Sequence, residues 1–214
     1  MDPREHVDEI ILALEREYPM AECTLDHREA YELLVGVRLA AQCTDARVNE
    51  VTPALFAAYP DAEAMAKAEP EDVEPYIRSC GFYHGKARDI VGAARMVVSE
   101  YGGRIPDSME DLLRLPGVGR KSANLILGDV YHIPGSVVVD THCIRLTNRI
   151  GLVDRKEPEK IEAALREILP PEKSNDFCHR MVLHSRAVCS ARSPRCQECC
   201  ICEWCRTGRE ITSL

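Results

Sequence analysis

Apolar residues recur at helical spacing along nearly the whole chain, and this periodicity constrains the fold more than any other feature. Near the N-terminus, Val7, Ile10 and Leu14 fall on one helical face. The segment YELLVGVRLAAQ is apolar almost all round, which predicts a central buried helix. The run 137–139 is strand-like but too short and isolated to build a sheet, so we interpret it as an extended connector. The sequence therefore predicts an all-α fold.

Proline, glycine and aspartate suggest where individual helices begin and end. A helix over 86–101 ends at a pair of glycines, and Pro158 opens a later one. Shorter helices are expected over 46–51, 53–59 and 61–68. Asp107 is predicted to cap the helix whose apolar face includes Leu112.

The chain has 214 residues and a formal net charge of −8. This length permits one large domain or two small ones, and in either case the chain can bury a hydrophobic core. The net negative charge argues against tight non-specific binding to nucleic acid, although a local stripe of basic residues can still bind DNA. Apolar runs stay well short of the roughly 20 residues that cross a bilayer, and the N-terminus lacks the apolar stretch of a signal peptide. We expect a cytoplasmic protein.

Six of the eleven cysteines crowd into 17 residues near the C-terminus. In a cytosolic protein, such density indicates a metal site before disulfides. The other five are scattered, and single cysteines of that kind are usually small buried apolar residues. The crowded cysteines are Cys189, Cys196, Cys199, Cys200, Cys202 and Cys205.

The string LPGVGRK lies between two amphipathic helical runs. Pro116 ends the first helix, while Gly117 and Gly119 permit turn conformations and remove side chains from the surface. The first amides of the second helix are thereby exposed, and such a helix start binds anions such as DNA phosphate. The pattern favours a helix-hairpin-helix DNA-binding element over a turn that uses glycine only for its geometry.

Several motifs together resemble those of the endonuclease III superfamily. They are LPGVGRKSAN followed by VVDTH, the earlier segment AQCTD, and the segment GFYHGKA. The resemblance covers almost the full length, including the cysteine tail. It implies two helical lobes: a six-helix barrel with the hairpin over residues 24–134, and a second lobe from residues 1–23 and 135–214. DNA is expected to lie in the groove between the lobes.

The resemblance also implies an enzyme of base excision repair, a DNA glycosylase with abasic-site lyase activity on oxidised pyrimidines. Its expected partner is double-stranded DNA with a damaged base or an abasic site, bound by a monomer near the nucleoid. Lys121 resembles the catalytic nucleophile, since a lysine amine can attack the sugar and form a Schiff base. Asp140 resembles the catalytic aspartate, whose ionised carboxylate can stabilise a cationic sugar.

The target nucleotide must leave the duplex stack before its sugar can react. By resemblance, Gln42 fills the gap and reads the orphaned base, and Phe82 wedges the other strand. The alternatives are a polar residue at a helix end and a core aromatic. Further DNA contacts are expected from the hairpin glycines and from Arg120, Arg192 and Arg195. The pocket is expected to include Thr44, Asp45 and His142.

Four of the tail cysteines follow the spacing C-x6-C-x2-C-x5-C, which matches the [4Fe–4S] pattern of the resembled family: Cys189, Cys196, Cys199 and Cys205. Cys200 and Cys202 do not fit it, and burial or service as alternative ligands are both open for them. The choice of four ligands therefore rests on the resemblance. A zinc site held by four thiolates is the competing interpretation.

Two other functions remain open. A non-catalytic DNA-binding module would bind abasic DNA without cutting it. A monofunctional mismatch or purine glycosylase would release a base and leave the strand intact. Lys121 argues against the second, because such relatives usually lack a lysine there.

Overall fold

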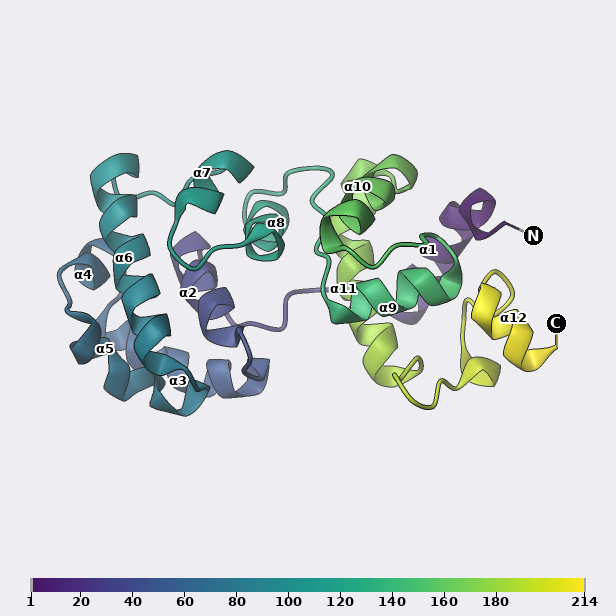
Figure 1. Ribbon diagram of the computed structural model, residues 1–214, viewed down its shortest axis with the longest axis horizontal. Helices are drawn as coiled ribbons and strands as arrows, with labels where there is room; N and C mark the ends of the chain where they lie inside the picture. Colours follow the sequence, from purple (N-terminus) through teal and green to yellow (C-terminus); the bar gives the residue numbers. More distant parts are fainter. Residues whose placement is uncertain (1, 214) are drawn as a thin grey trace. The chain divides into compact units, whose positions relative to one another are not determined.

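The computed structural model describes residues 2–213, which divide into two compact units. We call Cys23–Tyr131 the internal unit, and residues 2–22 with 132–213 the terminal unit. Every regular element in the described residues is a helix, which confirms the predicted all-α class (Figure 1). Helices long and apolar enough to span a membrane are absent from residues 2–213.

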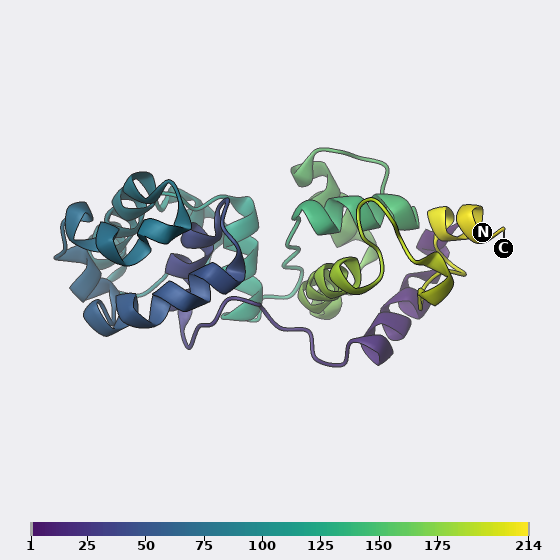
Figure 2. The same cartoon turned by 90° about the horizontal axis from the view of Figure 1, so that it is seen from below.

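The internal unit is built around α2 and α6. Helix α2 is buried nearly all round, as its apolar sequence predicts, and α6 packs against α2, α4 and α5 (Figures 1 and 2). The elements of this unit are α2 (Ala30–Ala40), α3 (Asp45–Ala58), α4 (Ala62–Ala66), α5 (Pro70–Ile77), η2 (Arg78–Cys80), α6 (Tyr83–Tyr101), α7 (Met109–Arg114) and α8 (Arg120–Asp129).

Two expectations about helix limits are wrong. Helix α3 runs unbroken through Pro53, where the sequence suggested two short helices. An internal proline costs about 3 kcal/mol, and burial of Val48, Leu55 and Phe56 on the same helix offsets that cost. Helix α7 is capped by Ser108 rather than Asp107, because the Ser108 hydroxyl accepts a hydrogen bond from the Asp111 amide at 3.1 Å.

The terminal unit joins the first helix of the chain to its last ones. Helix α11 packs against α1 and α9, and α12 packs against α9 (Figure 2). The elements are η1 (Pro3–His6), α1 (Val7–Glu17), α9 (Thr141–Ile150), α10 (Pro158–Ile168), η3 (Pro171–Lys173), α11 (Ser174–Ala187), η4 (Cys196–Glu198) and α12 (Arg206–Thr212). The segment 137–139 is extended and buried, as the sequence predicts.

Candidate functional site

The turn between α7 and α8 has the geometry that its glycines predict. Gly117 has φ +76°, a left-handed conformation that side chains rarely adopt. A Cβ at this position would lie 2.6 Å from Cδ of Arg38 and 3.0 Å from Cβ of Asp89. Those two residues form an ion pair, with the Arg38 Nε donating to Asp89 Oδ2 at 2.7 Å. The turn therefore rests directly on a salt bridge between α2 and α6.

We expect Gly117→Ala to destabilise the protein by more than about 1 kcal/mol. Alanine is strained at this positive φ, and its methyl group would clash with the Arg38–Asp89 ion pair. Urea unfolding would measure this loss. Gly119→Ala is the matched control, since Gly119 has ordinary φ and open space around it. Equal losses for the two variants would contradict this account of the turn.

The first turn of α8 presents cationic side chains at an uncapped helix start. Gly119 occupies the N-cap position and has no side chain to cover the first amides. Lys121 is exposed and Arg120 is half-buried within that turn. Backbone amides and two cations at one helix start together form a surface suited to phosphate.

Asp140 lies at the start of α9, in the terminal unit. Its Oδ1 accepts a hydrogen bond from the Cys143 amide at 2.7 Å, so the carboxylate is the N-cap of α9. The side chain is half-buried and follows the buried segment 137–139, which fixes its position. Asp140 and Lys121 thus belong to different units, and each lies at the N-terminal end of a helix.

His142 is held by the helix beside it. Its Nδ1 hydrogen-bonds with the Ser185 hydroxyl on α11, and the same hydroxyl accepts a hydrogen bond from Arg145. The imidazole is therefore fixed within the terminal unit, two residues after the Asp140 cap.

Gln42 and Phe82 share an unusual backbone feature. Both have positive φ, 54° and 48° respectively, although neither is glycine. Both side chains are exposed, Phe82 by 72%. The alternative of a core aromatic for Phe82 is therefore wrong. Strained backbone under exposed side chains is typical of functional loops.

Thr44 and Asp45 follow Gln42 directly, at the start of α3. The Thr44 hydroxyl caps α3 by accepting from the Arg47 amide at 3.3 Å. Asp45 Oδ2 accepts a hydrogen bond from Thr24 at 2.5 Å. These contacts give both residues a local structural role and place them beside the exposed Gln42.

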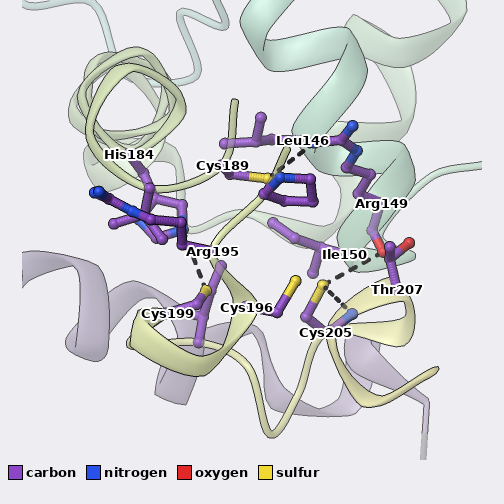
Figure 3. A pocket seen from close by; sticks show the side chains of 14 residues that line it. Leu146, Arg149, Ile150, His184, Cys189, Arg195, Cys196, Cys199, Cys205 and Thr207 are labelled. Atoms are coloured by element: carbon purple, nitrogen blue, oxygen red, sulfur yellow. Dashed lines mark hydrogen bonds between the residues drawn. The ribbon is translucent and has the colours of Figure 1, made fainter. Parts of the chain in front are cut away.

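Four cysteines line one pocket in the terminal unit (Figure 3). They are Cys189, Cys196, Cys199 and Cys205, the set selected by spacing. The other lining residues are mostly apolar and include Leu146, Ile150 and Ile201. Residues 2–213 contain no group of three or more His, Cys, Asp or Glu side chains arranged around a single metal ion position.

The remaining two cysteines of the tail lie elsewhere. Cys202 Sγ lies 3.7 Å from the Thr212 hydroxyl and packs against Gly208 of α12. Cys200 lies near Glu17 of α1, and burial raises the pKa of its thiol to about 11. Neither residue lines the pocket.

Burial makes three of the pocket thiols poor acids. It raises the pKa of Cys199 to about 12 and also raises the pKa of Cys196 and of Cys205. Neighbouring cysteines add to each rise, because adjacent thiolates repel. Thiolates in this pocket thus require a positively charged partner, which a metal centre supplies.

The sequence analysis did not identify two residues that contact the pocket cysteines. Arg149 on α9 donates to Cys189 Sγ at 3.3 Å and to the carbonyls of Ser190 and Ala191, both at 2.7 Å. His184 Nε2 lies 3.3 Å from Cys199 Sγ, and burial lowers the pKa of this imidazole to about 4. Figure 3 shows both side chains at the pocket wall. Their partners lie about 15 to 40 residues away in sequence, so no local pattern marks them.

The loop between the first two pocket cysteines carries Arg192 and Arg195, both exposed. The Arg195 side chain forms an ion pair with Glu198, with Nε and Oε2 3.1 Å apart, and also donates to the Ala187 carbonyl. Arg195 therefore supports the loop as well as carrying charge on its surface.

The chain matches known proteins over nearly all of its length. Residues 35–171 match the HhH-GPD superfamily base excision DNA repair proteins. Endonuclease III of Synechocystis is 45% identical, with 96% of this chain and 94% of that protein covered. Endonuclease III of Escherichia coli K12 is 36% identical, with 95% and 96% covered.

A solved structure agrees with these relatives. A trapped endonuclease III–DNA covalent intermediate, an estranged-adenine complex, is similar with a TM-score of 0.90 and 36% identity, covering 98% of both chains. The hairpin, the cysteine pocket and these similarities lead to one assignment. The chain belongs to the endonuclease III family within the HhH-GPD superfamily of base excision DNA repair proteins.

Proposed function

We propose that Lys121 and Asp140 carry the reaction of this chain, which is a DNA glycosylase and abasic-site lyase of base excision repair. The observation that carries the proposal is the start of α8, where exposed Lys121 stands beside uncapped amides suited to a DNA phosphate. A related endonuclease III has been trapped as a covalent intermediate with DNA, which supports a covalent route. Because its proposed substrate is damaged DNA, we also propose that the protein associates with the nucleoid.

Each residue has a defined part in the reaction. The Lys121 amine attacks C1′ of the damaged nucleotide, the N-glycosidic bond breaks, and the base leaves with the bonding electrons. The Asp140 carboxylate stabilises the positive charge that develops on the sugar. The sugar ring then opens: the lysine nitrogen loses a proton and forms a double bond to C1′, while the C1′–O4′ bond breaks and O4′ becomes a hydroxyl. The resulting protonated imine makes the C2′ proton acidic, and β-elimination then breaks the C3′–O bond to the phosphate.

Three duplexes test this function. They contain thymine glycol, an abasic site or a G·T mismatch, and each is scored for strand cleavage with and without alkali. We expect cleavage without alkali at thymine glycol and at the abasic site. Base release with cleavage only after alkali would indicate a monofunctional glycosylase. Binding without either product would indicate a non-catalytic module.

Gln42 and Phe82 are proposed to occupy the space that the flipped nucleotide leaves. Two observations support this: both side chains are exposed, and both sit on strained backbone. An exposed phenylalanine contributes little to folding, and an apolar wedge offsets part of the unstacking cost. The neighbouring Thr44 and Asp45 are proposed to lie near the pocket, while His142 supports the Asp140 segment.

We expect Phe82→Ala to leave the unfolding temperature unchanged and to slow base excision about tenfold, since unstacking costs a few kcal/mol. Single-turnover excision of thymine glycol would measure the effect. Met20→Ala is the matched control, because Met20 is also apolar and 71% exposed. An unchanged excision rate for Phe82→Ala would remove it from the wedge role.

The four pocket cysteines are proposed to hold a [4Fe–4S] cluster, for which four thiolates are the usual ligands. Their common pocket also includes several apolar side chains, which suits a group of many atoms. Zinc instead needs four sulfurs about 2.3 Å from a single point. When bound, the cluster supplies the positive charge that these buried thiolates need. It also holds the loop that presents Arg192 and Arg195, so we propose a structural role in DNA docking.

We expect Cys199→Ala to abolish the broad visible absorbance of an iron–sulfur cluster and to lower the unfolding temperature. Cys202→Ala should retain the absorbance, because its thiol lies outside the pocket. Absorbance and iron content of protein purified without oxygen would measure both. A colourless wild-type protein with stoichiometric zinc, or equal iron loss in both variants, would contradict the assignment.

A further inference from the structure

Lys86 of α6 is a buried cation that the proposed reaction does not use. Its side chain is 1% exposed, and its Nζ donates to the carbonyl of Leu39 at 2.7 Å and to that of Cys80 at 2.8 Å. Lysine is rarely buried to this extent, because an ammonium loses its hydration when it leaves water. The two hydrogen bonds compensate part of that loss.

Both acceptors of the Lys86 ammonium lie at helix ends. Leu39 is in the last turn of α2, and Cys80 is the last residue of η2. The last carbonyls of a helix have no partner within the helix, and this end carries partial negative charge. The Lys86 ammonium therefore satisfies two carbonyls that the helices themselves leave unpaired, and it joins two segments that are far apart in the sequence.

The two helix ends lead directly into the segments that carry Gln42 and Phe82. Gln42 lies three residues after Leu39, and Phe82 lies two residues after Cys80. The Lys86 amide also donates to the Phe82 carbonyl at 3.2 Å. Both Gln42 and Phe82 have positive φ, which residues other than glycine adopt only where the surrounding structure holds them. Lys86 thus contacts the backbone on which both exposed side chains depend.

We propose that Lys86 is a positioning residue for lesion recognition, which fixes the Gln42 and Phe82 loops relative to each other so that both side chains enter the same duplex. The inference rests on the proposed function, because it assumes that these two side chains fill the space of the flipped nucleotide. Loops that are held before binding lose little further conformational freedom when they enter DNA.

Lys86→Met removes the donors and keeps an unbranched side chain of similar length. The two helix ends then lose their common partner, and the loops are free to separate. We expect single-turnover excision of thymine glycol to slow about tenfold, as for loss of the wedge itself. The unfolding temperature should also fall, because two buried carbonyls lose a hydrogen bond. The excision rates must therefore be compared in two backgrounds.

The second background lacks the two inserted side chains. In a Gln42→Ala, Phe82→Ala chain the loops carry nothing to insert, so the further change Lys86→Met should slow excision less than about twofold. Residues that act through one another show such non-additive effects. An equal slowing by Lys86→Met in both backgrounds would show that it acts apart from the loops, and would overturn the proposal.

Fluorescence measures insertion without catalysis. The probe is a duplex with thymine glycol on an uncleavable 2′-fluoro sugar and with 2-aminopurine opposite the lesion, a base whose emission rises when it leaves the stack. At saturating protein, we expect Lys86→Met to give less than about half of the wild-type increase, because the inserted groups unstack the bases. A full increase with Lys86→Met would overturn the proposal.

Lys86→Arg covers the case in which Lys86→Met does not fold. Arginine keeps a cation with donors for both carbonyls, but its planar guanidinium is wider than an ammonium, so the spacing of the loops should change. We expect excision to slow about three- to tenfold, and only where Gln42 and Phe82 are present. An unchanged rate in the otherwise wild-type chain, or equal slowing in both backgrounds, would overturn the proposal.

Arg95→Met is the matched control. Arg95 also lies on α6 and donates to two carbonyls, those of Ala66 at 3.1 Å and of Ala68 at 2.9 Å. Ala66 ends α4, which leads into neither loop, so Arg95→Met should keep the excision rate. A loss equal to that of Lys86→Met would overturn the proposal, because any cation that binds carbonyls on α6 would then have the same effect.

The same experiment separates this inference from the function on which it rests. A Gln42→Ala, Phe82→Ala chain that excises thymine glycol at the wild-type rate would count against the proposed role of those side chains in DNA. Equal slowing by Lys86→Met in both backgrounds, with the double variant itself impaired, would count against Lys86 alone.

Discussion

Lys121→Gln is expected to lose abasic-site cleavage by about 10³-fold or more, because no other group on α8 offers an amine that can form the sugar imine. Lys121 is exposed in the first turn of α8, so its loss should not affect folding. Single-turnover cleavage of an abasic duplex, with borohydride trapping in parallel, would measure the effect.

Two variants separate chemistry from charge. Lys121→Arg keeps the positive charge beside the α8 amides, so DNA affinity should persist while the adduct is lost. Lys67→Gln removes another exposed lysine of the internal unit and should retain full activity. A Lys121→Arg protein that still forms a borohydride-stable adduct would remove Lys121 from the nucleophile role.

Asp140→Asn is expected to slow base excision by about 10²- to 10³-fold through loss of the carboxylate charge. Asparagine caps helices as well as aspartate does, so α9 should start at the same residue and the fold should remain. Excision of thymine glycol and the unfolding temperature, measured together, would separate the chemical effect from the structural one.

Asp61→Asn is the matched control for that change. Asp61 caps α4 in the same way, accepting from the Ala64 amide at 2.7 Å. Both variants lose one carboxylate from a cap, so any shared effect reflects helix stability alone. Equal excision rates in the two variants would contradict a catalytic role for Asp140.

Much of the fold could be predicted because helical periodicity is local information. The apolar pattern of α2 and the glycine stop after α6 each depend on neighbours within a few residues. The prediction of two short helices around Pro53 was wrong because tertiary packing stabilises α3 as one continuous helix through this proline. The local sequence does not show that packing.

The candidate site was only partly predictable for the same reason. The match to the cysteine pattern of the resembled family selected the four cysteines that line one pocket. By contrast, the buried Lys86 contacts the Leu39 carbonyl, 47 residues earlier in the chain. Arg149 donates a hydrogen bond to Cys189, about 40 residues later in the chain. Such contacts are set by the fold and leave no motif, and the exposure of Phe82 depends on the turn before α6.

The central claim is that the Lys121 amine bonds to the sugar of the damaged nucleotide. Its most direct test is to trap the reaction of wild-type protein with borohydride, digest the product and locate the attached sugar by mass spectrometry. The account predicts the sugar on Lys121, with trypsin unable to cleave after that residue. Attachment to another lysine or to the N-terminal amine would contradict it.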